Sequence, residues 1–167
     1  VDREALLHPV PDWLGVDDGA DDAVRLLADV ALAGGAVVVT VAAPDARTAL
    51  LRLQLAGLPP DLARTHVRAV LARRVVPRIC SRCRFACQQT KAPTRRLRLD
   101  PTALERLPRW VGLGCPACAD QGTTGALALA ELVRPGPGGE LVPLADSVPL
   151  ARRALELARE GDAPVES

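Results

Sequence analysis

Four cysteines give this chain its clearest chemical signature. They form two Cys-x2-Cys pairs, Cys80 with Cys83 and Cys115 with Cys118, separated by a long gap. Each pair brings two sulfurs close to one point, and the gap allows the pairs to meet from different parts of a fold. The spacing predicts one tetrahedral thiolate site that binds a structural zinc ion through all four residues. Two redox-active pairs, or a set of inert buried thiols, are the alternatives.

Three other residues are weaker candidates for metal binding. Cys87 lies soon after the first pair, and we expect it to be a free buried thiol, with a role as an alternative ligand as the other interpretation. His66 falls in a helical pattern, and His8 precedes a proline in the N-terminal segment. Neither histidine is needed where four thiolates are available.

Length and composition indicate a small domain that can bury a core. The chain has 167 residues, of which 49% are hydrophobic and only 2% aromatic, so the core must consist of Leu, Val and Ala. No stretch approaches the ~20 apolar residues of a membrane span, and no secretory signal opens the chain. Paired cysteines in an unsecreted protein favour metal binding over disulfides. These features together predict a cytoplasmic protein.

Positive charge is concentrated in one block. Between Arg64 and Arg98 the sequence has eleven arginine or lysine residues and no acidic residue. Such a block can bind phosphates or an acidic protein face, or it can offset the net charge of −2 that four thiolates leave on Zn²⁺. Nucleic acid is the less favoured partner, because aromatic residues for base stacking are nearly absent, with only Phe85 in the block.

The elements that must position the cysteines follow from the hydrophobic pattern. Residues 12–16 predict a short buried strand, and a helix is expected from about Asp21, which can cap it. Residues 36–41 are continuously apolar and β-branched, which is typical of a strand covered on both faces of a parallel sheet. This strand–helix–strand order predicts a right-handed βαβ unit.

The remaining pattern places both cysteine pairs on loops. The first pair is expected directly after a helix over residues 61–74, and the second within a glycine-rich loop over 114–125. The other predicted elements are helices over 45–56, 101–107 and 150–159, a strand over 127–133 and a turn over 135–139.

The segments around the cysteines carry a family resemblance. Residues 70–83 (VLARRVVPRICSRC) are similar to a stretch ending AQRLVRRLCPxC, and residues 114–132 to GCxxCxxTGYxGRxGIxELL. Both stretches belong to the type II secretion protein E and type IV pilus assembly ATPases. Shorter similarities to this family lie at residues 6–12, 33–40 and 49–57, so the resemblance covers about residues 5–161.

The resemblance implies a fold as well as a family. It implies an α/β architecture: a partial RecA-like parallel sheet with flanking helices, a small tetracysteine zinc-binding subdomain and a C-terminal helix. The expected divisions are residues 1–75 for the RecA-like portion, 76–134 for the zinc subdomain and 135–167 for the terminal turn, helix and tail. Complete motors of the family are hexameric rings driven by ATP hydrolysis.

The residues of the family's nucleotide chemistry are missing or altered. ATP hydrolysis needs a phosphate-binding GxxxxGK[ST] segment, and this sequence has none; its one lysine, Lys91, lies between the cysteine pairs. Asp18 stands where the family has its acidic water-orienting residue, while Ala20 and Ala42 stand at its arginine and histidine positions. We therefore expect no catalytic residue, with Asp18 a degenerate remnant, and no ATP or Mg²⁺ binding by the isolated chain.

Three functional hypotheses follow. The leading one is a degenerate, non-hydrolysing relative that acts as a zinc-stabilised docking or assembly module for secretion or pilus assembly proteins, including a complete ATPase subunit, at the inner face of the cytoplasmic membrane. The second is the C-terminal part of a split or longer ATPase whose P-loop lies on another segment. The third is a stand-alone zinc module that binds nucleic acid through the basic block.

Overall fold

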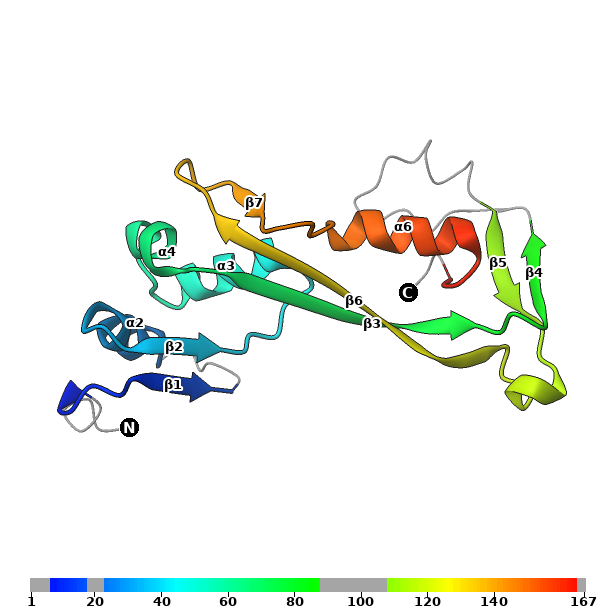
Figure 1. The fold of residues 1–167 in the computed structure, drawn as a ribbon, viewed down its shortest axis with the longest axis horizontal. Coiled ribbons are helices and arrows are strands. Elements are labelled where there is room, and N and C mark those ends of the chain that lie inside the picture. The colour runs from blue at the N-terminus through cyan, green and yellow to red at the C-terminus, as the bar shows by residue number, and fades with distance from the viewer. Residues whose placement is uncertain (1–6, 18–22, 88–107, 165–167) are drawn as a thin grey trace. The chain divides into compact units, whose positions relative to one another are not determined.

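The structure, a computed structural model, describes residues 7–17, 23–87 and 108–164 (Figure 1). Two strands alternate with helices in the first part, and paired strands and one last helix follow. The elements are β1 (Trp13–Val16), α2 (Val24–Leu32), β2 (Ala36–Val39), α3 (Ala46–Leu55), α4 (Pro60–His66), β3 (Val70–Ile79), β4 (Arg84–Cys87), β5 (Arg109–Gly112), the short 3-10 helix η2 (Pro116–Cys118), β6 (Thr123–Pro135), β7 (Leu141–Pro143) and α6 (Leu150–Glu160).

The chain divides into two compact units. The first comprises Val1–Ala72 and Leu132–Ser147, and the second comprises Arg73–Glu131 and Val148–Ser167. β1 and β2 form one two-stranded sheet in the first unit, and β4 and β5 form another in the second. The third sheet has the strand order β3-β6-β7. All four cysteines of the two pairs therefore belong to the second unit.

The predicted βαβ unit is present. β1 and β2 are parallel, with Trp13 opposite Ala36 and Val16 opposite Val39, and α2 connects them. α2 packs against β2 through a buried face that includes Leu27 and Val30. The predicted cap Asp21 lies outside the described residues; the described helix begins at Val24 without a side-chain cap.

The prediction that these two strands are buried was wrong. Burial alternates along both of them, and the side chains of Trp13 and Val38 are 66% and 56% exposed. In the described residues, α2 packs on the sheet while Trp13 and Val38 stay open to solvent. A run of β-branched residues therefore indicates a strand correctly, but it does not determine how many of its faces are covered.

The helix predicted over residues 45–56 is confirmed as α3. The side chain of Asp45 accepts a hydrogen bond from the Thr48 N–H at 2.7 Å, which satisfies one of the free N–H groups of the first turn. Gly57 follows the helix with φ +109°, a conformation that glycine adopts without strain. Both ends of α3 are thus fixed by local sequence.

The helix predicted over residues 61–74 was wrong in its second half. α4 ends at His66, and Val70 begins the ten-residue strand β3. Val70, Val75 and Val76 favour an extended strand, and Pro77 cannot continue a helix. Pairing with β6, more than forty residues further along, decides the outcome. The first cysteine pair consequently follows a strand, not a helix.

The region from the second cysteine pair to the hairpin is more regular than expected. Within the loop predicted over residues 114–125, Pro116–Cys118 form η2 and β6 already begins at Thr123. β6 is 13 residues long and extends the predicted strand in both directions. The turn predicted over residues 135–139 joins β6 to β7, with the Gly136 N–H donating to the Glu140 carbonyl at 2.7 Å.

The C-terminal helix is confirmed as α6. Its N–H group at Leu150 donates to the Glu131 carboxylate at 2.9 Å, and Gly161 ends it in the left-handed conformation. The short helix predicted over residues 101–107 lies outside the described residues. The predicted α/β class is confirmed: a parallel strand pair, flanking helices and a close group of four cysteines.

Candidate metal centre

The four paired cysteines lie at the ends of four strands. Cys80 directly follows β3 and Cys83 directly precedes β4, so the first pair forms the corner between these strands. Cys115 and Cys118 lie in the segment between β5 and β6, with Cys118 at the end of η2. The two corners are brought together although 35 residues separate Cys80 from Cys115.

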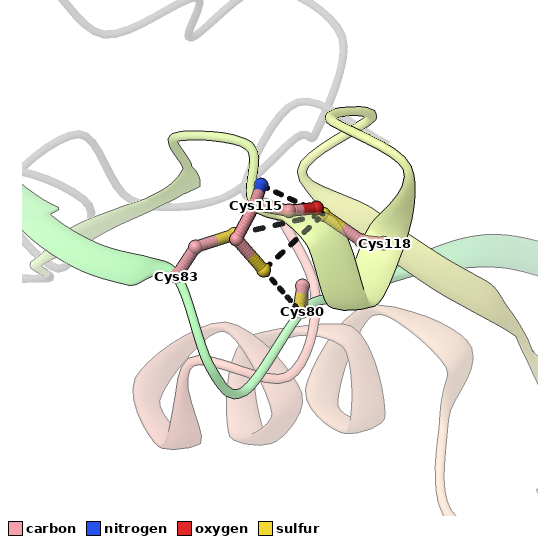
Figure 2. A group of neighbouring side chains, drawn as sticks. All are labelled: Cys80, Cys83, Cys115 and Cys118. Atoms are coloured by element: carbon pink, nitrogen blue, oxygen red, sulfur yellow. Dashed lines mark hydrogen bonds between the residues drawn. The ribbon is translucent and has the colours of Figure 1, made fainter.

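The four sulfurs converge on one point (Figure 2). The Sγ atoms are 3.9 Å apart for Cys80 and Cys115, 3.8 Å for Cys83 and Cys118, and 3.7 Å for Cys115 and Cys118. All four lie within 4.8 Å of one another, and none forms a disulfide. The predicted residues are thus close enough together to hold a metal ion.

Backbone N–H groups point at one sulfur in particular. The N–H groups of Cys115 and Gly122 both lie 3.3 Å from the Sγ of Cys118. Burial would raise the pKa of the Cys118 thiol, but these two N–H groups and the neighbouring thiols of Cys115 and Cys83 lower it to about 7. The Cys118 thiol therefore ionises more readily than an ordinary cysteine thiol.

Cys83 has the opposite tendency. Burial raises the pKa of its thiol to about 12, neighbouring thiols add to the rise, and a hydrogen bond from the Gly114 backbone opposes it. Four thiolates this close together repel one another unless a cation lies between them. The arrangement thus favours binding of a positively charged metal ion by all four sulfurs.

Two glycines near the cysteines, Gly112 and Gly122, lie in close backbone contact. A Cβ atom on Gly112 would lie 1.8 Å from the carbonyl oxygen of Gly122, and one on Gly122 would lie 2.4 Å from that of Gly112. The Gly122 carbonyl also accepts a hydrogen bond from the Cys80 N–H at 3.0 Å. Gly122 therefore touches both corners of the site, and Gly112 must lack a side chain for it to do so. The sequence reasoning missed Gly112, because only the fold brings it against Gly122.

The end of α6 supports the first corner. The Ile79 N–H, adjacent to Cys80, donates to the Asp162 carbonyl at 2.9 Å. Arg84 donates to the Glu160 carbonyl at 3.1 Å, and its guanidinium lies 5.4 Å from the ring centroid of Trp110. The strands that carry Cys80 and Cys83 are thus fixed to the C-terminal helix by main-chain and side-chain contacts.

The other predicted candidates lie apart from the four sulfurs. Cys87 ends β4, and its thiol donates to the Arg109 carbonyl at 3.3 Å. His66 ends α4, where its ring nitrogen Nδ1 lies 2.8 Å from the Thr65 hydroxyl. Asp18 and Ala20 lie outside the described residues, and Ala42 is exposed after β2. No helix in the described ranges combines the length and apolar character that a bilayer span requires.

Comparison with known proteins gives a consistent result. A sequence model of the family described as "Type II/IV secretion system protein" matches residues 18–151. The type IV pilus assembly ATPase PilB of Thermus thermophilus is 29% identical over 130 residues, which cover 77% of this chain and 15% of PilB. The type II secretion system protein E of Pectobacterium carotovorum is 31% identical over 130 residues, which cover 77% of this chain and 25% of that protein.

A third relative has the same extent of similarity. The type II secretion system protein HxcR of Pseudomonas aeruginosa is 29% identical over 129 residues, which cover 77% of this chain and 24% of HxcR. The chain thus spans about a quarter or less of the length of these relatives.

Proposed function

Because the chain belongs to the type II/IV secretion system protein family, we propose that it serves secretion or pilus assembly as a zinc-stabilised docking or assembly module that does not itself hydrolyse ATP. The observation that carries this proposal is the sulfur geometry. Four sulfurs bound at about 2.3 Å to a tetrahedral zinc ion are about 3.8 Å apart. Three sulfur–sulfur distances, 3.7, 3.8 and 3.9 Å, agree with this value, and all four sulfurs lie within 4.8 Å of one another.

The proposed ligands are Cys80, Cys83, Cys115 and Cys118. Four protein ligands leave no coordination position for water or substrate, so the ion has a structural role. Tetrahedral sites with four sulfurs select zinc or iron over oxygen-loving cations. Zinc would fasten the β3–β4 corner to the β5–β6 corner, and part of the folding free energy of the second unit would come from metal binding.

The proposed lack of hydrolysis rests on the residues of this chain. A phosphate-binding loop supplies backbone N–H groups, a lysine and a Mg²⁺-binding hydroxyl, and these 167 residues contain no GxxxxGK[ST] segment. Asp18, Ala20 and Ala42 stand where the resemblance to the family implies an acidic water-orienting residue, an arginine and a histidine. We infer a role beside the ATPases of a secretion or pilus system, at the cytoplasmic face of the membrane.

Metal analysis of the purified chain tests the zinc proposal. We expect one zinc per chain after expression in zinc-supplied medium, no zinc in Cys118→Ser, and unchanged zinc in Cys87→Ser, the matched control. Chelation should speed amide hydrogen exchange first in β4, β5 and the corners that carry the cysteines, because the metal stabilises them locally. Equal zinc content in both variants, or iron in place of zinc, contradicts the proposal.

A nucleotide assay tests the proposed lack of ATP hydrolysis. The zinc-loaded chain should neither bind ATP at micromolar concentration nor release phosphate from it. A second candidate, a C-terminal part that works with a P-loop on another segment, is favoured by the short span of the chain relative to its relatives. Under that candidate, adding a P-loop-bearing ATPase subunit of the same system yields hydrolysis that depends on this chain.

A further inference from the structure

The residues on either side of the first cysteine pair both hold the C-terminal end of α6. Ile79, just before the pair, donates its N–H to the Asp162 carbonyl at 2.9 Å. Arg84, just after the pair, donates to the Glu160 carbonyl at 3.1 Å, and its guanidinium lies 3.7 Å from the Asp162 carboxylate. These contacts meet on one short segment, residues 160–162, which we name the helix terminus.

The second cysteine pair is linked to the helix terminus through β5. Gly161 packs against the ring of Trp110 in β5, since a Cβ atom on this glycine would lie 2.7 Å from the ring. Further along the same strand, Gly112 is in backbone contact with Gly122, whose N–H lies 3.3 Å from a sulfur of the second pair. The helix terminus is therefore connected to both of the corners that carry the cysteines.

The N-terminal end of α6 is held by a different residue. The Leu150 N–H donates to the Glu131 carboxylate at 2.9 Å. Glu131 lies on β6, well past the second cysteine pair, and belongs to the same compact unit as α6. One end of α6 thus depends on residues beside the proposed metal ligands, whereas the other end depends on a residue far from them in the sequence.

We propose that the conformation of α6 is coupled to the metal centre: zinc bound by the four sulfurs fixes the helix terminus, and loss of zinc releases it, while Glu131 keeps the first turn in place. This inference rests on the proposed zinc site and adds a metal-responsive element to it. Zinc supplies the bonds that join the two corners. Without those bonds the corners separate and carry Ile79, Arg84 and Trp110 away from the helix terminus.

A coupling of this kind is reciprocal. If zinc favours the docked helix terminus by a given factor, the docked helix terminus favours zinc binding by the same factor. One hydrogen bond of ordinary strength changes an equilibrium by about fivefold, and the side chain of Arg84 donates one to the helix terminus. Substitutions that weaken the docking of the helix terminus should therefore lower zinc affinity, although they leave every sulfur in place.

Amide hydrogen exchange of the zinc-loaded full chain, followed by NMR before and after chelation, tests the release directly. Removing zinc should speed exchange over residues 157–163 by about tenfold or more, and that of the Leu150 amide by less than about threefold. The amides of α3, in the other unit, are the internal control and should change by less than about twofold. Unchanged exchange at the helix terminus, or equal acceleration along all of α6, overturns the proposal.

A substitution beside the first cysteine pair tests the reciprocal effect. Arg84→Ala removes the side-chain link to the helix terminus and keeps all four cysteines. It should still bind one zinc per chain, with an affinity lowered by about fivefold or more in competition with a chromophoric chelator. Arg82→Ala is the matched control, because Arg82 is an exposed arginine within the first cysteine pair, and its affinity should change by less than about twofold.

A substitution in the helix terminus itself approaches the same coupling from the other side. Gly161→Ala forces the helix terminus away from the Trp110 ring, at a position remote from the cysteines in the sequence. It should lower zinc affinity by about fivefold or more, because the displaced contact is overpacked. Gly139→Ala, where φ is also positive and no atom lies within 4 Å of the added Cβ, is the control with unchanged affinity.

The outcomes separate this coupling from the proposed function. Equal zinc affinities within either matched pair of variants overturn the coupling. A chain that binds one zinc while its helix terminus does not respond to chelation refutes the coupling alone. A chain that binds no zinc refutes the zinc site, and the coupling with it.

Discussion

Substituting Gly112 should weaken metal binding although all four cysteines remain. The Cβ atom of alanine would lie 1.8 Å from the Gly122 carbonyl oxygen, against the 3.4 Å or more of ordinary contact, so the two backbone segments must separate by about 1.6 Å. No flexible side chain can move aside, because the atoms in the way are backbone. The Gly122 N–H and carbonyl, which hold the Cys118 sulfur and the Cys80 N–H, must shift with them.

The expected size follows from these contacts. Overpacking costs about 1–3 kcal/mol, and each of the two hydrogen bonds contributes about 1 kcal/mol, so Gly112→Ala should lower the free energy of unfolding by about 3–5 kcal/mol. Loss of an N–H group that supports a metal ligand typically costs about 10–100-fold in metal affinity. We expect a zinc affinity reduced by this factor, with the four sulfurs still present.

Competition with a chromophoric chelator measures the affinity, and urea unfolding at fixed free zinc measures stability. Gly125→Ala is the matched control: its φ is +70°, yet no atom lies within 4 Å of the added Cβ. The control should show only the left-handed strain, about 1–2 kcal/mol, with unchanged zinc affinity. A Gly112→Ala protein that binds zinc within twofold of the unsubstituted chain refutes the reasoning.

Two further predictions concern α6. In Gly161→Ala the new Cβ would lie 2.7 Å from the Trp110 ring at a φ of +76°, whereas in the control Gly139→Ala the φ is +84° and no atom lies within 4 Å. Urea unfolding should therefore show Gly161→Ala to be less stable than Gly139→Ala by about 1–3 kcal/mol. Equal losses of stability in the two variants would contradict a contact with Trp110. The hydrogen bond from Arg153 lowers the pKa of Glu156 below its ordinary value of 4.5. The ionised Glu156 therefore stabilises the folded chain above pH 4.5, and this stabilisation disappears as the pH falls through the lower folded-state pKa. The difference in urea midpoint between Glu156→Gln and the unsubstituted chain should therefore vanish in acid, and a difference that persists there rules out this origin.

Elements with local signals could be predicted from the sequence. α3 is fixed by the Asp45 cap and the glycine that follows it, and α6 by its apolar period and Gly161. The four cysteines were found by spacing alone, because each Cys-x2-Cys pair places two sulfurs together through a turn of only four residues. In these cases the residues that decide the structure lie within a few positions of one another.

β3 shows where local reasoning fails. Apolar residues at helical spacing continue past His66 in the sequence, yet the chain turns extended at Val70 because β6 pairs with it. When a strand pairs with a segment more than forty residues away, the residues of the strand itself do not indicate that partner. The solvent-exposed faces of β1 and β2 could not be predicted either, because the number of covered faces depends on segments that are distant in the sequence.

The sequence by itself determined the family, the class of fold and the four residues able to hold a metal ion. Only the tertiary structure decided that all four sulfurs lie within 4.8 Å of one another, that Gly112 and Gly122 come into contact beside them, and that the chain from Val70 to Ile79 is a strand paired with β6. Residue types and short spacings can be read directly from the sequence. The close approach of distant backbone segments and the burial of a strand face depend instead on packing, which exists only once the whole unit has folded.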